Sequence, residues 1–183
     1  MNLETERLKI RTIRENDLDD FLEYRSDAQV CEFQAFPPLE RERAEKFIAS
    51  AKDGEFGKAG EWVQLVAELK SENKVIGDIG LKPEAYDARI VEFGMTFSAK
   101  YQKNGFAREA ITEIINHLFE QKGIHRVIAI TDIKNIPAIQ LVENLNFRRE
   151  AEFKESFWNE GSGSWRDEYL YAMLAKDWKT NLK

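Results

Sequence analysis

The segment that decides the fold is Phe93-Gly94-Met95-Thr96-Phe97-Ser98-Ala99-Lys100-Tyr101-Gln102-Lys103-Asn104-Gly105-Phe106-Ala107-Arg108-Glu109-Ala110. Within it the apolar spacing changes from the two-residue period of a strand to the three- and four-residue spacing of a helix. Apolar residues alternate from Val91 to Phe97, and they recur three and four apart from Ala107 to Phe119. The change falls on a short turn, so the sequence predicts a strand that leads into a helix through residues 102–107.

The start of this predicted helix is a candidate anion site. Its first backbone N–H groups have no intrahelical partners, and the macrodipole places about half a positive charge there. Gly105 lets the backbone approach a phosphate closely, and Ala107 keeps the first turn uncrowded. Lys100, Lys103 and Arg108 add positive charge at the rim. The alternative interpretation is that Gly105 only makes the turn.

The spacing Gln102-x-x-Gly105-x-Ala107 is more specific than a single glycine. It resembles motif A, [Gln/Arg]-x-x-Gly-x-[Gly/Ala], of the GCN5-related N-acetyltransferase (GNAT) superfamily. The resemblance implies that loop amides hold the pyrophosphate of acetyl-CoA and that the preceding strand carries its pantetheine arm. The sequence contains neither the dinucleotide pattern G-x-G-x-x-G nor the P-loop pattern G-x-x-x-x-G-K-[ST]. The cofactor-binding residues implied by this motif are Met95, Thr96, Phe97, Gln102, Lys103, Asn104, Gly105, Phe106, Ala107 and Arg108.

A second motif begins at Asn135. The sequence predicts a helix here, with Asn135 as its cap, Pro137 in its first turn and Asn146 able to take the left-handed conformation at its end. The segment resembles motif B of the same superfamily through Asn135, Ala138, Leu141 and the pair Asn146-Phe147. The resemblance implies that Asn135 also presents its amide to the cofactor arm. Capping alone is the alternative role.

Both ends of the chain extend the resemblance to nearly its whole length. The opening Thr5-Glu6-Arg7-Leu8-x-Ile10-Arg11 and the closing Trp165-Arg166-Asp167 with Tyr171 resemble the ribosomal-protein N-terminal acetyltransferase (RimJ/RimL-type) branch. The implied fold is α/β, the GNAT acyl-CoA N-acyltransferase fold, with a mixed central sheet of about seven strands flanked by helices. In that fold two parallel strands splay apart beside the cofactor, often with a bulge in the first. We expect residues 1–183 to form a single domain of this kind.

Composition limits the possible partners and compartments. The formal net charge of −6 argues against nucleic-acid binding and is compatible with a cationic or amine-bearing acceptor. No apolar run reaches transmembrane length and the N-terminus resembles no export signal, so we expect a cytoplasmic protein without membrane contact, as a monomer or homodimer. Cys31, the single cysteine, is expected to be a buried thiol. We expect no metal, because His117 and His125 do not have ligand spacing.

The reaction implied by the resemblance is direct transfer of the acetyl group of acetyl-CoA to a primary amine. At about pH 7.5 a protein α-amine of pKa about 7.7 to 8.0 is roughly one-third neutral, whereas a lysine amine is neutral at about one part in a thousand. A site with few acid–base groups suits the α-amine, and the branch resemblance also favours a protein or peptide N-terminus. The alternatives are a small-molecule amine, such as a polyamine or antibiotic, and a non-catalytic acyl-CoA-binding module.

Glu92 is the candidate for proton chemistry. It lies on the predicted strand before the phosphate loop, on the face opposite Val91 and Phe93, and relatives use a carboxylate on this strand to receive the amine proton through water. The alternative is that Glu92 faces solvent or pairs with a cross-strand cation. Asp167 and Glu168 are the next candidates, either for proton transfer or for binding the substrate ammonium group.

Two positions depart from the branch and three aromatic residues are candidates for the acceptor pocket. Relatives often carry serine or threonine where Ala138 stands, and some carry a tyrosine acid where Val142 stands. The missing hydroxyls support the non-catalytic alternative. In the superfamily the first helices and their loops form one wall of the acceptor site. The resemblance therefore makes three aromatic residues candidates for that pocket, with core or loop packing as the alternative: Phe33, Phe36 and Phe56.

Overall fold

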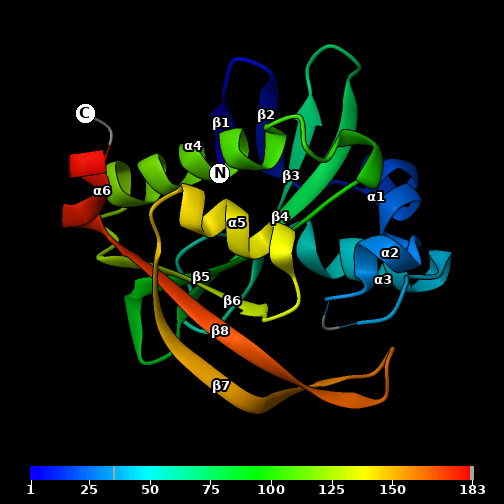
Figure 1. The fold of residues 1–183 in the computed structure, drawn as a ribbon. Helices are drawn as coiled ribbons and strands as arrows, with labels where there is room; N and C mark the ends of the chain where they lie inside the picture. The colour runs from blue at the N-terminus through cyan, green and yellow to red at the C-terminus, as the bar shows by residue number, and fades with distance from the viewer. Residues whose placement is uncertain (35, 182–183) are drawn as a thin grey trace.

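The structure is a computed structural model that describes residues 1–34 and 36–181, with side chains described as far as Trp178. The described residues form one mixed sheet with helices against both faces (Figure 1). The strands are β1 (Asn2–Glu4), β2 (Leu8–Thr12), β3 (Val63–Leu69), β4 (Lys74–Glu84), β5 (Asp87–Phe97), β6 (Arg126–Asp132), β7 (Arg148–Asn159) and β8 (Ser164–Leu174). The helices are α1 (Leu18–Arg25), α2 (Ala28–Cys31), α3 (Arg41–Ala51), α4 (Phe106–Gln121), α5 (Ile136–Asn144) and α6 (Ala175–Asn181), with 3-10 turns η1 (Glu15–Asp17) and η2 (Ala99–Tyr101).

The α/β fold with a mixed sheet is confirmed, but the strand number is not. Eight strands are present among the described residues, in the order β1-β2-β3-β4-β5-β6-β8-β7, where about seven were expected. The additional strand is β1, whose three residues are too few to display an alternating pattern. The helices α2 and α6 were not expected either, because segments of four and seven residues carry little helical periodicity.

The sheet opens between β5 and β6. These are its only parallel neighbours in the described part of the chain, because α4 returns the chain across the sheet between them. They pair only from Ile90↔Arg126 to Glu92↔Ile128, although β5 continues to Phe97. The expected splay is therefore confirmed. A register shift between β4 and β5 is present as well, but it falls between Pro83 and Glu84, whereas the pairing from Gly77↔Phe97 to Pro83↔Val91, which includes the splayed end of β5, is continuous.

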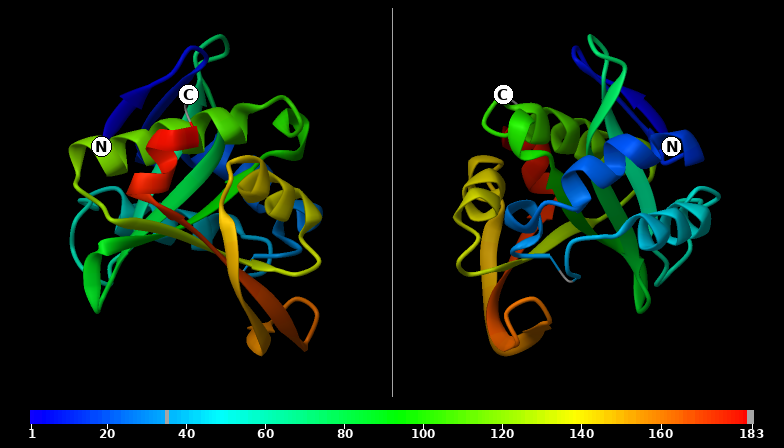
Figure 2. Two further views of the ribbon diagram at one scale, coloured as in Figure 1. Left: turned by 60° about the vertical axis from the view of Figure 1, so that its left-hand side comes forward. Right: turned by 90° about the vertical axis from the view of Figure 1, so that its right-hand side faces the viewer.

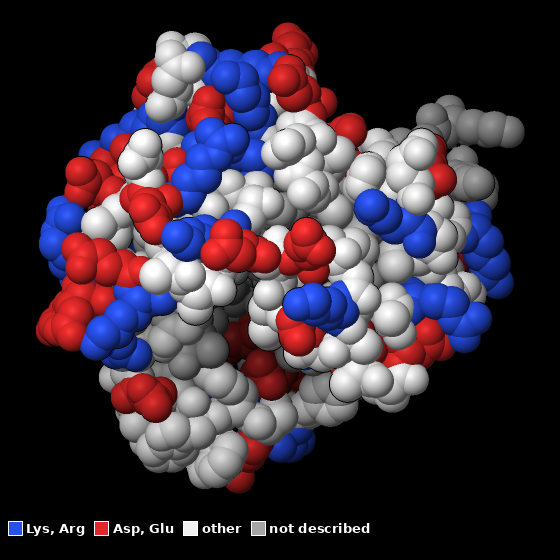
Figure 3. Space-filling model, turned by 180° about the vertical axis from the view of Figure 1, so that it is seen from behind, with Lys and Arg blue, Asp and Glu red and all other residues white. Residues whose placement is uncertain are grey.

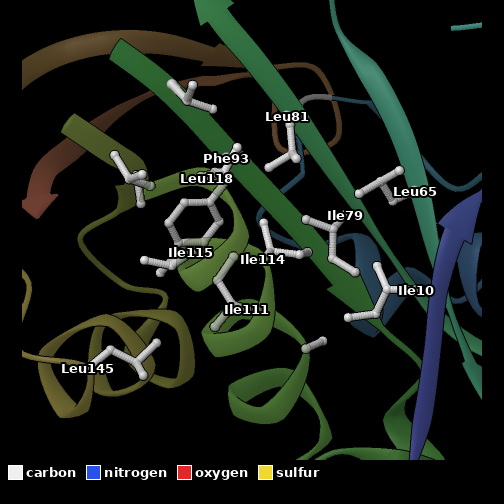
Figure 4. Close-up of a cluster of buried hydrophobic side chains, with 14 of the residues drawn as sticks. Ile10, Leu65, Ile79, Leu81, Phe93, Ile111, Ile114, Ile115, Leu118 and Leu145 are labelled. Atoms are coloured by element: carbon white, nitrogen blue, oxygen red, sulfur yellow. The ribbon is translucent and has the colours of Figure 1, made fainter. Parts of the chain in front are cut away.

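The larger core lies between α4 and the sheet. Its helical stripe and strand residues are all essentially buried, and Figure 4 shows them directed toward one another: Ile111, Ile114, Ile115 and Leu118 from α4, with Ile79, Leu81 and Phe93 from the sheet. Full burial of each such side chain contributes about 1.5 to 3 kcal/mol relative to exposure. This packing fixes α4, and therefore its N-terminal turn, against the end of β5.

A second core lies on the other face of the sheet. There α1 and α3 pack Phe21, Tyr24 and Ile48 against Val66 of β3, and Figure 2 shows these helices on the side opposite α4 and α5. Cys31 is buried beside this core, and its Sγ donates to the carbonyl of Arg25 at 3.3 Å. The expected buried thiol is confirmed.

The β7–β8 hairpin extends away from both cores (Figures 1 and 2). Its end nevertheless contacts the segment after α2, because Asn159 Nδ2 donates to the carbonyl of Glu32 at 3.4 Å. Asn159 is buried by this contact. The hairpin and the α1–α2 segment therefore border the same face of the sheet, the face opposite α4.

Candidate functional site

The turn between β5 and α4 has the conformation that an anion-binding loop needs. Gly105, the N-cap of α4, has φ +81°, and Lys103 has φ +63°. The amides of the first turn of α4 have no carbonyl one turn earlier in the helix to bind. Gln102 Nε2 donates to the carbonyl of Phe97 at 2.9 Å, and Asn104 Nδ2 donates to the carbonyl of Gln102 at 3.0 Å. The turn is thus held by hydrogen bonds from its own side chains.

Arg7, from the segment before β2, holds the same turn from outside. Its Nε donates to Glu109 Oε2 at 2.6 Å and its Nη1 to the carbonyl of Asn104 at 3.0 Å. The guanidinium also lies over the ring of Phe106, 4.2 Å from the centroid. Thr5 adds a hydroxyl hydrogen bond to Glu109. The sequence predicted Thr5 and Arg7 only as part of the family resemblance and gave no sign of this structural role, which depends on contacts about 100 residues away.

A cavity of about 440 Å³ opens beside this turn and runs along the end of β5. The residues that line the cavity come from β5, the turn, the start of α4, α5 and α2. Of the expected cofactor residues, those lining it are Met95, Thr96, Phe97, Gln102, Lys103, Gly105, Phe106, Ala107, Arg108 and Asn135. Asn104 does not line the cavity but stabilises the turn through its hydrogen bond to the carbonyl of Gln102. Gln29 and Val30 of α2 and Gln34 in the segment after it also line the cavity; the sequence did not predict them, because α2 is too short to show a pattern and Gln34 lies outside any helix or strand.

Asn135 caps α5 as expected. Its Oδ1 accepts from the N–H of Ala138 at 3.2 Å, and Pro137 lies in the first turn. Asn146 has φ +60°, which confirms the left-handed end of this segment. No described residue accepts a hydrogen bond from Asn135 Nδ2, so the amide donor is available on the wall of the cavity.

On the opposite face of the sheet, three carboxylates lie near one another. Glu168 of β8 pairs with Asp132 of β6 in the register, and Glu92 of β5 pairs with Ile128 on the same face. Burial raises the pKa of Glu168, the Ser156 hydroxyl donating at 2.8 Å opposes this, and the charges of Asp132 and Glu92 raise it further. Figure 3 shows Asp and Glu side chains deep in a hollow on this face.

The remaining carboxylates are not equivalent to Glu168. Glu92 is paired with Lys82, whose Nζ lies 2.6 Å from its Oε2 and also lies over the ring of Trp62. Asp167 points to the other face, where its carboxylate accepts from Lys154 Nζ at 3.0 Å and from the N–H of Glu155 at 2.9 Å. Asp167 and Glu168 therefore separate, and of these two only Glu168 lies on the face of the sheet that carries Asp132 and Glu92.

The three candidate aromatic residues also separate. Phe33 lines the cavity. Phe36 packs against the second core, with the Arg25 guanidinium 4.8 Å from its ring centroid, and Phe56 packs against the larger core. Only Phe33 is therefore placed to contact a ligand.

Neither a metal-ligand cluster nor a helix suited to span a membrane is found among the described residues. No group of three or more His, Cys, Asp or Glu side chains in that part of the chain has the arrangement of a metal site. None of the helices there combines the length and apolar character that crossing a membrane requires.

The sequence matches the family described as "Acetyltransferase (GNAT) domain" over residues 7–148. The chain belongs to the GNAT acetyltransferase family. It is therefore an acetyl-CoA-dependent N-acetyltransferase. The match includes both the turn at Gly105 and the capped helix at Asn135, the two segments that carried the resemblance in the sequence.

Two full-length comparisons agree with this GNAT assignment. An uncharacterized N-acetyltransferase, YnaD, of Bacillus subtilis is 30% identical over 178 residues, 97% of this chain and 99% of the relative. The crystal structure of an acetyltransferase of the GNAT family from Bacillus anthracis has a TM-score of 0.85 at 28% identity, over 96% of this chain and 99% of that one.

Shorter matches extend to relatives with named acceptors. The [ribosomal protein uS5]-alanine N-acetyltransferase of Escherichia coli is 31% identical over 85 residues, 46% of this GNAT chain and 43% of the relative. The spermidine N(1)-acetyltransferase of Vibrio cholerae is 26% identical over 91 residues, 50% of this chain and 53% of the relative. The partial matches therefore include both a ribosomal-protein acetyltransferase and a polyamine acetyltransferase. The name of the relative that matches over nearly the whole chain specifies no acceptor.

Proposed function

We propose that this enzyme binds acetyl-CoA with its pyrophosphate on the amides at the start of α4 and its pantetheine arm along the end of β5. The left-handed Gly105, the free N-terminal amides and the cavity of about 440 Å³ beside them are the observations that carry the proposal. Arg108 and Lys103 line the same cavity and bring positive charge toward a phosphate. The amide of Asn135 is placed to hold the arm from α5.

In this proposal the acceptor amine approaches from the opposite face of the sheet, through the opening between β5 and β6. The neutral amine attacks the thioester carbon, a C–N bond forms, the C–S bond breaks, and the electron pair leaves on sulfur. A backbone N–H near the end of β5 stabilises the oxyanion, since the pairing with β6 ends at Glu92. Alignment of amine and thioester accounts for several kcal/mol of the barrier, by order of magnitude.

The proton of the attacking nitrogen passes to water in this proposal, with Glu92 and Glu168 as the nearby carboxylates. Glu92 is neutralised by Lys82, whereas Glu168 is held by a serine hydroxyl and is repelled by two other carboxylates. Glu168 is therefore the better candidate to attract an ammonium group.

We propose a protein or peptide N-terminal α-amine as the acceptor, because a larger fraction of such an amine is neutral near pH 7.5. The similarity to the uS5-alanine enzyme supports this choice. The carboxylates on the acceptor face favour a small polycationic amine as the second candidate, and the similarity to the spermidine enzyme supports that one.

Release of coenzyme A thiol tests the proposal. The wild-type protein is offered acetyl-CoA with a panel of N-terminal peptides and of small mono-, di- and polyamines. We expect thiol release with at least one of these amines. Acetyl-CoA binding by calorimetry without thiol release from any of them would support a non-catalytic acyl-CoA-binding module instead.

The cofactor position is tested by Gly105→Asp. Aspartate adds a negative charge to the turn proposed to hold the phosphates, with its Cβ 3.4 Å from Arg7 Nη2, so we expect acetyl-CoA binding to be lost in calorimetry. Gly123→Asp is the matched control, because Gly123 also has a left-handed φ of +65° but lies at the other end of α4. A folded Gly105→Asp protein with wild-type acetyl-CoA affinity would contradict the proposed site.

A further inference from the structure

Thr96 carries a buried hydroxyl that no described residue satisfies. Its side chain is 4% exposed, and Oγ1 has no hydrogen-bond partner in the described part of the chain. Burying a hydroxyl without a partner is unfavourable, since its hydrogen bonds to water are lost on folding. The residue also lines the cavity of about 440 Å³ at the end of β5. A ligand in this cavity would supply the missing partner.

The direction of the Thr96 side chain follows from the strand. Its neighbours Met95 and Phe97 pack in the core under α4, and side chains alternate along a strand. Thr96 therefore faces the other side of the sheet, together with Gly94 and Glu92. A Cβ atom at Gly94 would meet no atom within 4 Å, so the strip of β5 between Thr96 and Glu92 is open.

Thr96 borders a polar cluster on the same face of the sheet, and no member of this cluster hydrogen-bonds to its hydroxyl; Arg25 in the cluster also has a buried Nη1 without a partner. The cross-strand partner of Thr96 is Asp78 of β4, whose carboxylate already accepts from Arg25 Nε at 2.9 Å and from Gln64 Nε2 at 2.5 Å. The Tyr24 hydroxyl is also buried beside Asp78, and burial, with the Asp78 charge and hydrogen bonding, raises the pKa of this phenol well above its usual value. Tyr24 does not line the cavity, whereas Thr96 does.

We infer that the Thr96 hydroxyl binds the attacking amine of the acceptor and orients it toward the thioester. This inference rests on the proposed function, which puts the thioester at the end of β5 and the acceptor on the face that Thr96 shares with Glu92. Oγ1 accepts an N–H of the neutral amine, which leaves the nitrogen lone pair free to attack. The interaction strengthens as the nitrogen becomes cationic, because hydrogen bonds to charged groups are stronger.

The hydroxyl takes no proton in this step. As the C–N bond forms and the C–S bond breaks, the nitrogen proton passes to water and the electron pair leaves on sulfur. Thr96 therefore contributes orientation and charge stabilisation, the kind of interaction that raises kcat because it strengthens in the transition state.

Thr96→Val and Thr96→Ser test the inference, because valine keeps the shape without the hydroxyl and serine keeps the hydroxyl. For Thr96→Val we expect kcat/KM for the acceptor to fall about ten- to a hundredfold, with the acetyl-CoA Kd unchanged. The fall should be the same at every pH, since the hydroxyl does not titrate in that range. Thr96→Ser should recover activity to within about threefold of the wild type.

Thermal unfolding separates catalysis from structure. Because the hydroxyl has no protein partner, Thr96→Val should unfold at the wild-type temperature or above it. Tyr24→Phe is the control: it removes a buried hydroxyl beside Asp78 that does not line the cavity, and we expect it to retain wild-type activity.

Each other outcome has a distinct meaning. Wild-type kcat/KM in Thr96→Val would overturn the inference. It would also be overturned if the loss of activity in that variant were accompanied by weaker acetyl-CoA binding or by a lower unfolding temperature. If the wild-type protein itself binds no acetyl-CoA and acetylates no amine, the proposed function fails and the inference fails with it. This result is distinct from a loss of activity that is confined to Thr96→Val.

Discussion

At the scale of single residues, Glu168 and Glu92 lie on the same face but differ in their partners. Glu92 is neutralised by Lys82 at 2.6 Å, whereas Glu168 accepts only a serine hydroxyl and has a raised pKa, mainly because it is buried. The charges of Asp132 and Glu92 add to that increase. A cationic acceptor would relieve this repulsion, so Glu168 should matter more than Glu92 for acceptor binding.

We expect Glu168→Gln to raise the KM for a cationic acceptor about tenfold, and Glu92→Gln to raise it less, since one close charge pair of about 1.4 kcal/mol corresponds to a factor of ten. In the wild type, protonation of Glu168 removes its charge as pH falls through its raised pKa. The ratio of wild-type to Glu168→Gln kcat/KM should therefore shrink toward one in acid, and the titration of the amine itself cancels in this ratio.

Stability gives an independent readout of the same carboxyl group. A carboxyl with a raised pKa in the folded state disfavours folding once it ionises, so its cost is absent below the unfolded pKa and is fully present above the folded pKa. Glu168→Gln should therefore gain unfolding temperature relative to the wild type at pH 8 and gain none at pH 4. Equal differences at both pH values would show that the Glu168 pKa is not raised.

Arg7 is the second residue whose role depends on contacts far along the chain. It connects to Glu109 and to the carbonyl of Asn104 on the phosphate turn, and it covers the Phe106 ring. We expect Arg7→Met to raise the KM for acetyl-CoA about tenfold while the KM of the acceptor stays unchanged, because the turn loses its external support. Steady-state kinetics with each substrate varied in turn measures both values.

Arg126→Met is the matched control for Arg7→Met. Arg126 also pairs with a carboxylate, that of Glu150, but it lies at the far end of β6 from the phosphate turn. It should leave the acetyl-CoA KM unchanged. The same increase in both variants would assign the effect of Arg7→Met to general loss of stability.

At the scale of elements, α5 depends on Asn135 for its first turn. Oδ1 of Asn135 caps the N–H of Ala138, and Nδ2 has no acceptor among the described residues. We expect Asn135→Ala to lower the free energy of unfolding by about 1 kcal/mol. Asn135→Asp should keep the cap and the stability but lower acetyl transfer, because it removes the amide donor. Full activity in Asn135→Asp would leave Asn135 with a structural role only.

At the scale of the whole molecule, one buried ion pair connects the α1–α2 layer to the sheet. Arg25 at the end of α1 and Asp78 of β4 form two hydrogen bonds, and Asp78 is 1% exposed. Arg25→Met leaves the carboxylate without its cation, so we expect a loss of about 3 to 5 kcal/mol in urea unfolding. The wall of the cavity formed by α2 depends on this layer.

Arg41→Met is the control for the buried pair. Arg41 pairs with Asp19 at the surface, where both side chains are more than half exposed, and such pairs contribute about 0 to 1 kcal/mol. A loss in Arg25→Met no larger than in Arg41→Met would mean that hydrophobic packing alone positions α1.

The parts of the fold that sequence reasoning predicted correctly are those encoded over a few consecutive residues. The alternation before Phe97 and the helical spacing after Ala107 fixed β5 and α4, because burial of one face requires those periods. The cap at Asn135 and the left-handed Asn146 followed in the same way. The strand β1 and the helix α2 were missed because they are too short to show any period.

What only the tertiary structure decided are the contacts between residues distant in the sequence. Alternation requires Asp167 and Glu168 to face opposite sides of the sheet, but only the pairing of β8 with β6 places Glu168 beside Asp132 and on the face that carries Glu92. The support of the phosphate turn by Arg7 and the unpartnered hydroxyl of Thr96 likewise depend on strand register and on layer packing. The sequence alone determined the family and the turn between β5 and α4, because short-range patterns specify local backbone conformation. Packing determined which side chains line the cavity beside that turn, since that depends on many residues at once.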